Sequence, residues 1–158
     1  MISFNAGTAG EEACALCRKL NEAGVETFCT ALYCEAAGAG KAWDIATAKG
    51  IATCSVLVVL MTEGWRVSPP CNHETQMATE RLVDRSNPLH SIVPVVFPDF
   101  DKQKDDDAES GKHWLARVGA GVQQIHTRGK SADDWMDAVL LGARSILCHI
   151  IRLALLTH

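Results

Sequence analysis

Three short patterns in this sequence contain residues that could bind a metal, a phosphate or a redox partner. Cys14 and Cys17 have C-x-x-C spacing, but they lie in a helical pattern without a second pair or a nearby histidine, which favours small buried side chains. Gly7–Gly10 could offer backbone amides to a phosphate, yet the run matches neither G-x-G-x-x-G nor the Walker pattern, and an ordinary capped turn is favoured. Asp105–Asp107 has no matching ligands at a usable spacing. We therefore expect none of these three patterns to form a metal site, a redox pair or a phosphate-binding loop.

The most informative polar stretch runs from Thr62 to Glu74, directly after the aliphatic run Ser55–Met61. An aliphatic run of this kind is typical of a central parallel strand that is buried on both faces. Parallel α/β sheets bind ligands beyond the carboxyl ends of their strands, so this stretch is expected at the ligand-binding edge. Glu74 is therefore a candidate ligand-binding residue. The competing interpretation is that Glu74 is a solvated carboxylate that interacts favourably with the helix dipole at the start of a helix.

The elements that must position these residues alternate between short apolar runs and helical patterns, as in βαβ units. The expected strands are Ile2–Asn5, Val25–Cys29, Ser55–Met61, Ser91–Phe97 and Val122–His126. The expected helices are Glu11–Ala23, Trp43–Lys49, Asn72–Val83, Trp114–Val118 and Asp133–Ile151, with loops at Ala6–Gly10, Thr30–Lys41 and Asp99–Lys112. Thr8 and Glu11 form a plausible capping box for the first helix. Five strands alternating with helices predict a doubly wound parallel sheet.

Composition limits the class of protein. With 158 residues, the chain is expected to form a single domain over 1–158, in which 146–158 is the apolar end of the C-terminal helix. A net charge of −4 without a basic stripe argues against nucleic acid as a partner. Seven scattered cysteines and the lack of a signal-peptide pattern favour a reducing, cytoplasmic location. Ile146–Leu156 is too short to span a bilayer, and Arg152 interrupts it, so no membrane span is expected.

Several short boxes follow one another along the chain in a characteristic order. They are Ile2–Asn5, Gly24–Phe28, Gly40–Trp43 with Ile45 and Ile51, Cys54–Met61, Gly64–Glu74 and Ile92–Phe97. Together they resemble the boxes of Toll/interleukin-1 receptor (TIR) domains, from the first-strand F-I-S-Y to the later I-P-V. The resemblance covers residues 2 to 148. Its most specific part is S-x-x-C-x-x-E, from Ser68 to Glu74, directly after a strand.

The resemblance implies a flavodoxin-like, doubly wound, five-stranded parallel sheet with helices on both faces. For one branch of the family it also implies cleavage of the nicotinamide–ribose bond of NAD+, which is the substrate, without a metal or other cofactor. The products would be nicotinamide and ADP-ribose or a cyclic ADP-ribose, formed in immune or cell-death signalling, and TIR–TIR self-association would be expected.

The catalytic residue implied by the resemblance is Glu74. A carboxylate near the ribose could stabilise the oxocarbenium-like charge that remains when neutral nicotinamide leaves, and no general acid is needed for that leaving group. The implied substrate-binding residues are Phe4, Asn5, Thr30, Ala31, Leu32, Trp43, Ser68 and Cys71. Trp43 would stack on a base or brace the neighbouring loop, although a core role is the commoner one for such a tryptophan.

Two positions depart from the pattern of NAD+-cleaving members. Many of these carry a tryptophan four residues before the glutamate, where this chain has Pro70, and Trp65 lies further upstream. The acidic residue that is common after the second strand is replaced by Thr30, and the nearest acid is Glu35. The departures affect how ribose and nicotinamide would be positioned.

Three other functions stay open at this point. The main alternative is a non-catalytic TIR module that signals only by homotypic assembly. A nucleoside deoxyribosyltransferase-like enzyme, which also uses a glutamate near a ribose, is a weaker candidate. A phosphoacceptor receiver domain is disfavoured because no strand ends in the aspartate cluster that its chemistry requires.

Overall fold

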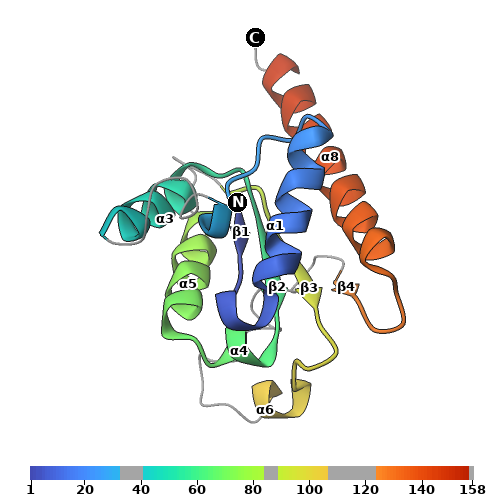
Figure 1. Ribbon diagram of the computed structural model, residues 1–158. Helices are drawn as coiled ribbons and strands as arrows, with labels where there is room; N and C mark the ends of the chain where they lie inside the picture. Colours follow the sequence, from blue (N-terminus) through green and yellow to red (C-terminus); the bar gives the residue numbers. More distant parts are fainter. Residues whose placement is uncertain (33–40, 84–88, 107–123, 157–158) are drawn as a thin grey trace.

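One parallel sheet organises the structure. The computed structural model describes residues 1–32, 41–83, 89–106 and 124–156 (Figure 1). Four strands pair in the order β1-β2-β3-β4: β1 (Ile2–Ser3), β2 (Val56–Met61), β3 (Ser91–Val96) and β4 (Ile125–His126). Cys29 adds an isolated parallel bridge to Ile2 on the side of β1 away from β2. Counting that bridge as an outer strand gives the flavodoxin-like order 2-1-3-4-5, so the α/β expectation is confirmed.

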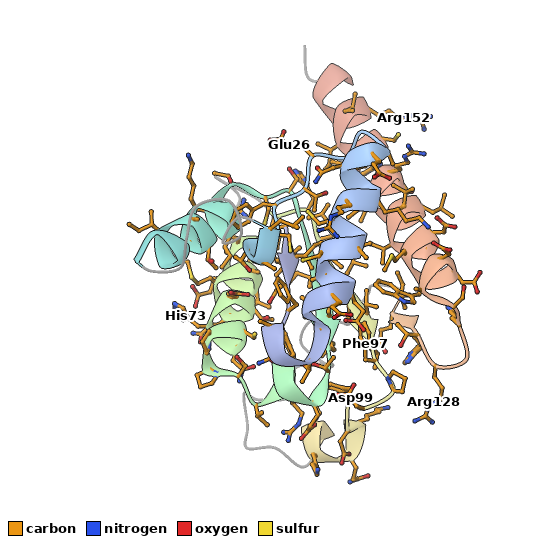
Figure 2. All side chains as sticks on the ribbon, in the orientation of Figure 1. Glu26, His73, Phe97, Asp99, Arg128 and Arg152 are labelled. Atoms are coloured by element: carbon orange, nitrogen blue, oxygen red, sulfur yellow. The ribbon has the colours of Figure 1, made fainter. Side chains whose placement is uncertain are left out.

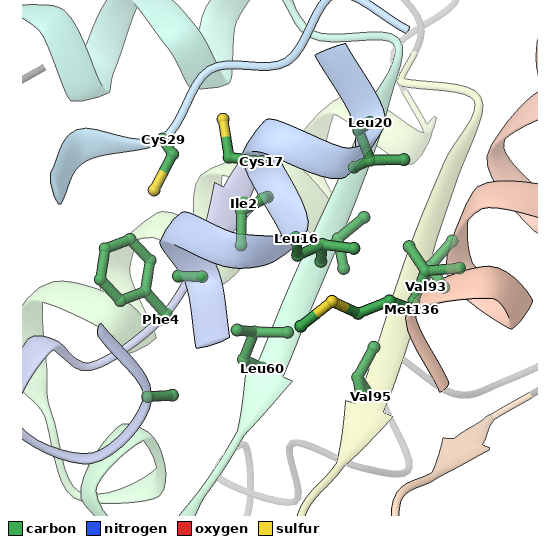
Figure 3. Packing of buried hydrophobic residues seen from close by; sticks show 14 of the residues in the cluster. Ile2, Phe4, Leu16, Cys17, Leu20, Cys29, Leu60, Val93, Val95 and Met136 are labelled. Carbon is green, nitrogen blue, oxygen red and sulfur yellow. The ribbon is translucent and has the colours of Figure 1, made fainter. Parts of the chain in front are cut away.

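Helices cover both faces of the sheet (Figure 1). Against one face lie α1 (Ala6–Glu22) and α8 (Ala132–Leu156), and against the other lie α3 (Lys41–Thr53), α4 (Glu63–Arg66) and α5 (Pro69–Val83). Figure 3 shows Leu16 and Leu20 of α1 together with Met136 of α8 packed over the aliphatic side chains of β2 and β3. Every residue of β3 is buried, as expected of a strand with helices on both sides.

The first helix begins earlier than the sequence predicts. Asn5 is its N-cap, with Oδ1 accepting a hydrogen bond from the Gly7 amide at 3.0 Å, and the helix runs from Ala6 with a kink at Ala9. The expected turn over Ala6–Gly10 and the expected cap at Thr8 are therefore wrong. Asparagine is a stronger N-cap than threonine, and Asn5 takes this role three residues after the first residue of β1.

Other boundaries also differ from the expectations. The second strand is reduced to the bridge at Cys29, and Thr30–Leu32, expected as loop, are helical. A short helix α6 (Lys102–Asp106) lies within the segment expected as a loop. The helix α5 starts at Pro69 rather than Asn72 because proline is well suited to the first turn of a helix. The expected helix Trp114–Val118 falls outside the described residues.

The C-terminal helix α8 is slightly longer than the expected Asp133–Ile151. Ile146 packs against the core beside α1, whereas Leu141 and Ile151 are largely exposed. Within the part of the chain that the structure covers, no helix has both the length and the apolar character needed to cross a membrane.

The close approach of α4 to α1 depends on Gly64. A Cβ added at Gly64 would lie 2.5 Å from Thr8 Cγ2 and 2.7 Å from Thr8 Oγ1, and the Thr8 hydroxyl itself lies 2.6 Å from that of Thr62. We expect Gly64→Ala to lower the free energy of unfolding by about 1–3 kcal/mol, as overpacking typically does. Urea denaturation measures this.

A second glycine provides the control for that measurement. A Cβ at Gly142 of α8 would meet nothing within 4 Å. Gly142→Ala should therefore be neutral or stabilise the fold by up to about 1 kcal/mol through helix propensity. If Gly64→Ala unfolded at the same urea concentration as the wild type, the proposed α1–α4 contact would be wrong.

Candidate functional site

Glu74 is the side chain that the sequence singled out for catalysis. It lies in a buried polar cluster formed by Ser3, Trp65 and Glu74. Ser3 Oγ donates a hydrogen bond to Glu74 Oε2 at 2.6 Å. Trp65 Nε1 donates to Ser3 Oγ at 3.3 Å. Glu74 is only 7% exposed, and Ser3 and Trp65 are buried more completely. We call these three residues the Glu74 cluster.

Local structure explains how the cluster is assembled. Successive strand residues face opposite sides of the sheet, so Ile2 packs beneath α1 while Ser3 faces α5. Trp65 belongs to α4, whose N-cap Thr62 accepts a hydrogen bond from the Trp65 amide at 3.1 Å. Because α4 follows β2 directly, this cap places the indole beside the end of β1.

Burial raises the pKa of the Glu74 carboxyl above its ordinary value. The hydrogen bond from Ser3 lowers it, but the effect of burial is larger. No lysine or arginine side chain among the residues that the structure describes forms an ion pair with this carboxylate. A buried carboxylate with a single hydroxyl donor and no cation is costly for the fold. Such groups occur more often at functional sites than elsewhere.

Cys71 lies one helical turn before Glu74, but it is poorly suited to nucleophilic chemistry. Its Sγ donates a hydrogen bond to the Phe4 carbonyl at 3.3 Å. Burial, together with the negative charge of Glu74, raises the pKa of the Cys71 thiol to about 11. The thiol is therefore protonated at neutral pH, and its role in the structure is to connect α5 to the end of β1.

The remaining residues that the sequence singled out lie at several places around the carboxyl end of the sheet. Phe4 is buried in the core cluster beneath α1 (Figure 3), and the half-buried Ala31 and Leu32 pack against the same cluster. Asn5 caps α1, and Thr30 is buried. The other two are Ser68, which is half-buried and precedes α5, and Trp43, whose side chain lies outside the described ones.

Two members of the cluster were not among the predicted site residues. Ser3 belongs to the first-strand box Ile2–Asn5 but is not one of the expected site residues. A serine inside an apolar strand nevertheless indicates a polar contact. Trp65 was considered only as a distant substitute for the tryptophan absent at position 70. His73, which precedes Glu74 in sequence, points outward from α5 (Figure 2).

The patterns considered for metal or redox chemistry take other roles. Cys17 is buried, donates a hydrogen bond to the Thr27 carbonyl at 3.4 Å, and lies near Cys29 (Figure 3). Across the described ranges, no group of three or more His, Cys, Asp or Glu side chains could hold a metal ion.

Glu74 is absent from the linings of two cavities found among the described residues. The larger, of about 590 Å³, lies at the amino-terminal end of the sheet, near Met1, Ser55 and Val56. Parallel sheets bind ligands at the opposite end, so this cavity is poorly placed for a substrate. The smaller, of about 320 Å³, lies at the carboxyl ends of β3 and β4.

The hydrogen bond between Ser3 and Glu74 has a measurable consequence. Because this bond lowers the pKa of Glu74, Ser3→Ala should raise that pKa further above the ordinary glutamate value. Carboxyl ¹³C chemical shifts followed through a pH titration would measure the change. An unchanged pKa of Glu74 in Ser3→Ala would contradict the assigned bond.

Sequence comparison adds a family match to this geometry. Residues 1–144 match the sequence model of a family described as TIR domain. The match covers all four strands, α1, α3 to α6 and the first half of α8. No curated protein matches the chain.

Proposed function

Because the chain belongs to the TIR domain family, we propose that it is an NAD+ nucleosidase with Glu74 as its catalytic carboxylate. The reaction cleaves the nicotinamide–ribose bond and yields nicotinamide with ADP-ribose or a cyclic ADP-ribose. In this proposal the domain acts in immune or cell-death signalling in the cytoplasm and self-associates through TIR–TIR contacts.

One observation carries the proposal: Glu74 is a buried carboxylate next to the carboxyl end of β1, and no Lys or Arg side chain in the described ranges forms an ion pair with it. A group that only served the fold would be more stable there as a neutral side chain. Its position agrees with the edge at which parallel sheets bind ligands. The resemblance of the S-x-x-C-x-x-E run to the family pattern supports the proposal, because it matches Glu74 to the catalytic glutamate of the NAD+-cleaving branch.

The chemistry requires little beyond a well-placed negative charge. The glycosidic C1′–N bond breaks, and its electron pair returns to the pyridinium nitrogen, so nicotinamide leaves neutral. The ribose becomes oxocarbenium-like, and an ionised Glu74 stabilises that charge more strongly in a low-dielectric site than in water. Water then adds to C1′ and loses a proton, or a nitrogen of the adenine adds to give the cyclic product.

The structure bears on the missing tryptophan at position 70. Pro70 lies exposed in the first turn of α5. Because it is a proline, this position contributes no aromatic ring beside Glu74. Trp65 approaches from α4 instead, and its indole N–H holds the Ser3 hydroxyl that binds Glu74. In the proposed enzyme Trp65 is a positioning residue, since it acts on Glu74 through Ser3.

The second candidate function is a non-catalytic TIR module that acts by assembly. The small exposure of Glu74 favours this alternative. Leu141 and Ile151 on α8 are also exposed apolar side chains of the kind found at protein interfaces. The two functions differ in whether NAD+ is consumed.

The test is to incubate NAD+ with the domain over a range of protein concentrations and to quantify nicotinamide by chromatography. We expect nicotinamide release that rises more steeply than in proportion to protein, since self-association is expected to complete the pocket. Deoxynucleosides under the same conditions should release no base. Absence of nicotinamide at every concentration, with a folded and self-associated protein, would leave assembly as the function.

A further inference from the structure

The cavity of about 320 Å³ beyond β3 and β4 carries an arrangement of charges that the proposed function has not used. Lys102, His126 and Arg128 line it, and no carboxylate is among its described lining residues. The whole chain has a net charge of −4, whereas the lining of this cavity is rich in cationic and hydrogen-donating side chains. Such a lining favours an anionic ligand.

The carboxylates nearest in sequence bind other groups. Asp99 Oδ2 accepts a hydrogen bond from the Glu63 amide at 3.1 Å. Asp101 accepts one from the Lys104 amide at 3.1 Å and pairs with the Lys104 side chain. Neither Lys102 nor Arg128 forms an ion pair with a carboxylate in the described ranges. Figure 2 shows Phe97, Asp99 and Arg128 at this same end of the molecule.

The apolar walls of the cavity are fixed in place. Phe97 packs edge-on against Trp135 with 5.7 Å between ring centroids, and Phe100 is buried in the opposite core cluster. Arg128 Nη2 donates to the Pro98 carbonyl at 3.4 Å, which restrains the guanidinium and leaves other N–H groups available. Rigid apolar walls with cations at one side suit a ligand that has both an apolar ring and phosphates.

We propose that this cavity binds the diphosphate of a nucleotide, with Arg128 and Lys102 on the phosphates and the phenylalanine walls against the sugar or base. Guanidinium groups recognise phosphate oxygens through paired hydrogen bonds, and lysine contributes a point charge. A cavity of about 320 Å³ is at the small end of the range for such ligands.

The ligand has two possible sources. Neighbouring strands are spaced by ~4.8 Å, so β3 and β4 lie about 10 and 14 Å from β1 at the same edge of the sheet. The ADP half of an NAD+ molecule whose nicotinamide ribose lies at Glu74 could extend toward the cavity, and this assignment rests on the proposed function. A free nucleoside diphosphate is the other source, and it does not depend on catalysis.

Calorimetric titration of ADP into the full chain, with a chelator present, tests the site without any reaction. ADP should bind the wild type and Glu74→Gln equally. The double variant Lys102→Ala/Arg128→Ala should bind at least ~10-fold more weakly, because each charge-assisted hydrogen bond to phosphate contributes about that factor. Arg18→Ala/Lys49→Ala removes two exposed cations elsewhere and should bind ADP like the wild type.

The outcomes separate this inference from the proposed activity. Equal ADP affinity in the Lys102/Arg128 variant and the wild type, or no binding at millimolar ADP, would overturn the diphosphate site. Competition between NAD+ and ADP in Glu74→Gln identifies the dinucleotide as an occupant, whereas its absence with ADP bound identifies a free nucleotide. ADP binding that depends on Arg128 in a protein that releases no nicotinamide would retain the site and reject the nucleosidase.

Discussion

Glu74→Gln should reduce the rate of NAD+ cleavage at pH 7 by at least ~10²-fold, the size of loss typical when a group that stabilises transition-state charge is removed. Glutamine has nearly the same shape as glutamate, and its carbonyl oxygen can still accept the hydrogen bond from Ser3. Only the negative charge is lost. Initial rates of nicotinamide release at saturating and low NAD+ would measure the effect on kcat and on kcat/KM.

The same substitution should make the domain more stable at neutral pH. The pKa of Glu74 is raised in the folded state, so the folded protein holds this proton more tightly than the unfolded chain does. Stability from this group is therefore complete below the unfolded pKa of about 4.3 and is lost as the pH rises through the folded pKa. In urea denaturation, Glu74→Gln should have a higher free energy of unfolding than the wild type at pH 7. The difference should disappear near pH 4.

Glu80→Gln is the matched control, because Glu80 is exposed on the same helix. It should change neither the rate of NAD+ cleavage nor the free energy of unfolding by a measurable amount. A Glu74→Gln protein that was less stable than the wild type at pH 7 would show that the ionised carboxylate stabilises the fold, contrary to this prediction.

Trp65→Ala should cause the largest loss of stability, about 3–5 kcal/mol, since truncating a fully buried aromatic side chain leaves a cavity. Trp65 also joins α4 to the α5 face of the core and donates the hydrogen bond that orients Ser3. A domain of ordinary stability has only about 5–15 kcal/mol in total, so this variant should be marginally folded at 37 °C. Urea denaturation at 25 °C measures the loss.

Two further variants separate bulk from hydrogen bonding. Trp65→Phe keeps most of the volume and loses the indole N–H, so its loss of stability should be much smaller than that of Trp65→Ala. Val67→Ala, at an exposed apolar neighbour, should stay within about 0.5 kcal/mol of the wild type. Equal stability of Trp65→Ala and the wild type would contradict the buried position of this residue.

Much of the fold could be predicted because its signals are local. The aliphatic run that became β2 and the helical spacing of Ala13, Leu16, Cys17 and Leu20 both identify buried faces directly, and all four helix residues are buried. Boundaries were less accurate because caps compete. Thr8 was the expected N-cap, but β1 ends at Ser3, and Asn5, expected within that strand, caps the helix instead.

The Glu74 cluster could be predicted only in part. The box pattern identified Glu74, but its partner Ser3 lies 71 positions away in sequence and Trp65 lies 62 positions from Ser3. No periodicity relates residues so far apart. Their contact depends on the parallel pairing of β1 with β2 and on α4 beginning directly after β2. The exposed Pro70 likewise gave no indication that a tryptophan would approach from another helix.

The most direct test of the account is nicotinamide release from NAD+ across pH 4 to 8, measured for the wild type and Glu74→Gln side by side at one high protein concentration. Since the reaction requires the ionised carboxylate, the wild-type rate should fall as the pH drops through a pKa above the ordinary glutamate value. Glu74→Gln, shown by circular dichroism to be folded, should release almost none at any pH. Equal release by both proteins would contradict the assignment of Glu74 as the catalytic residue.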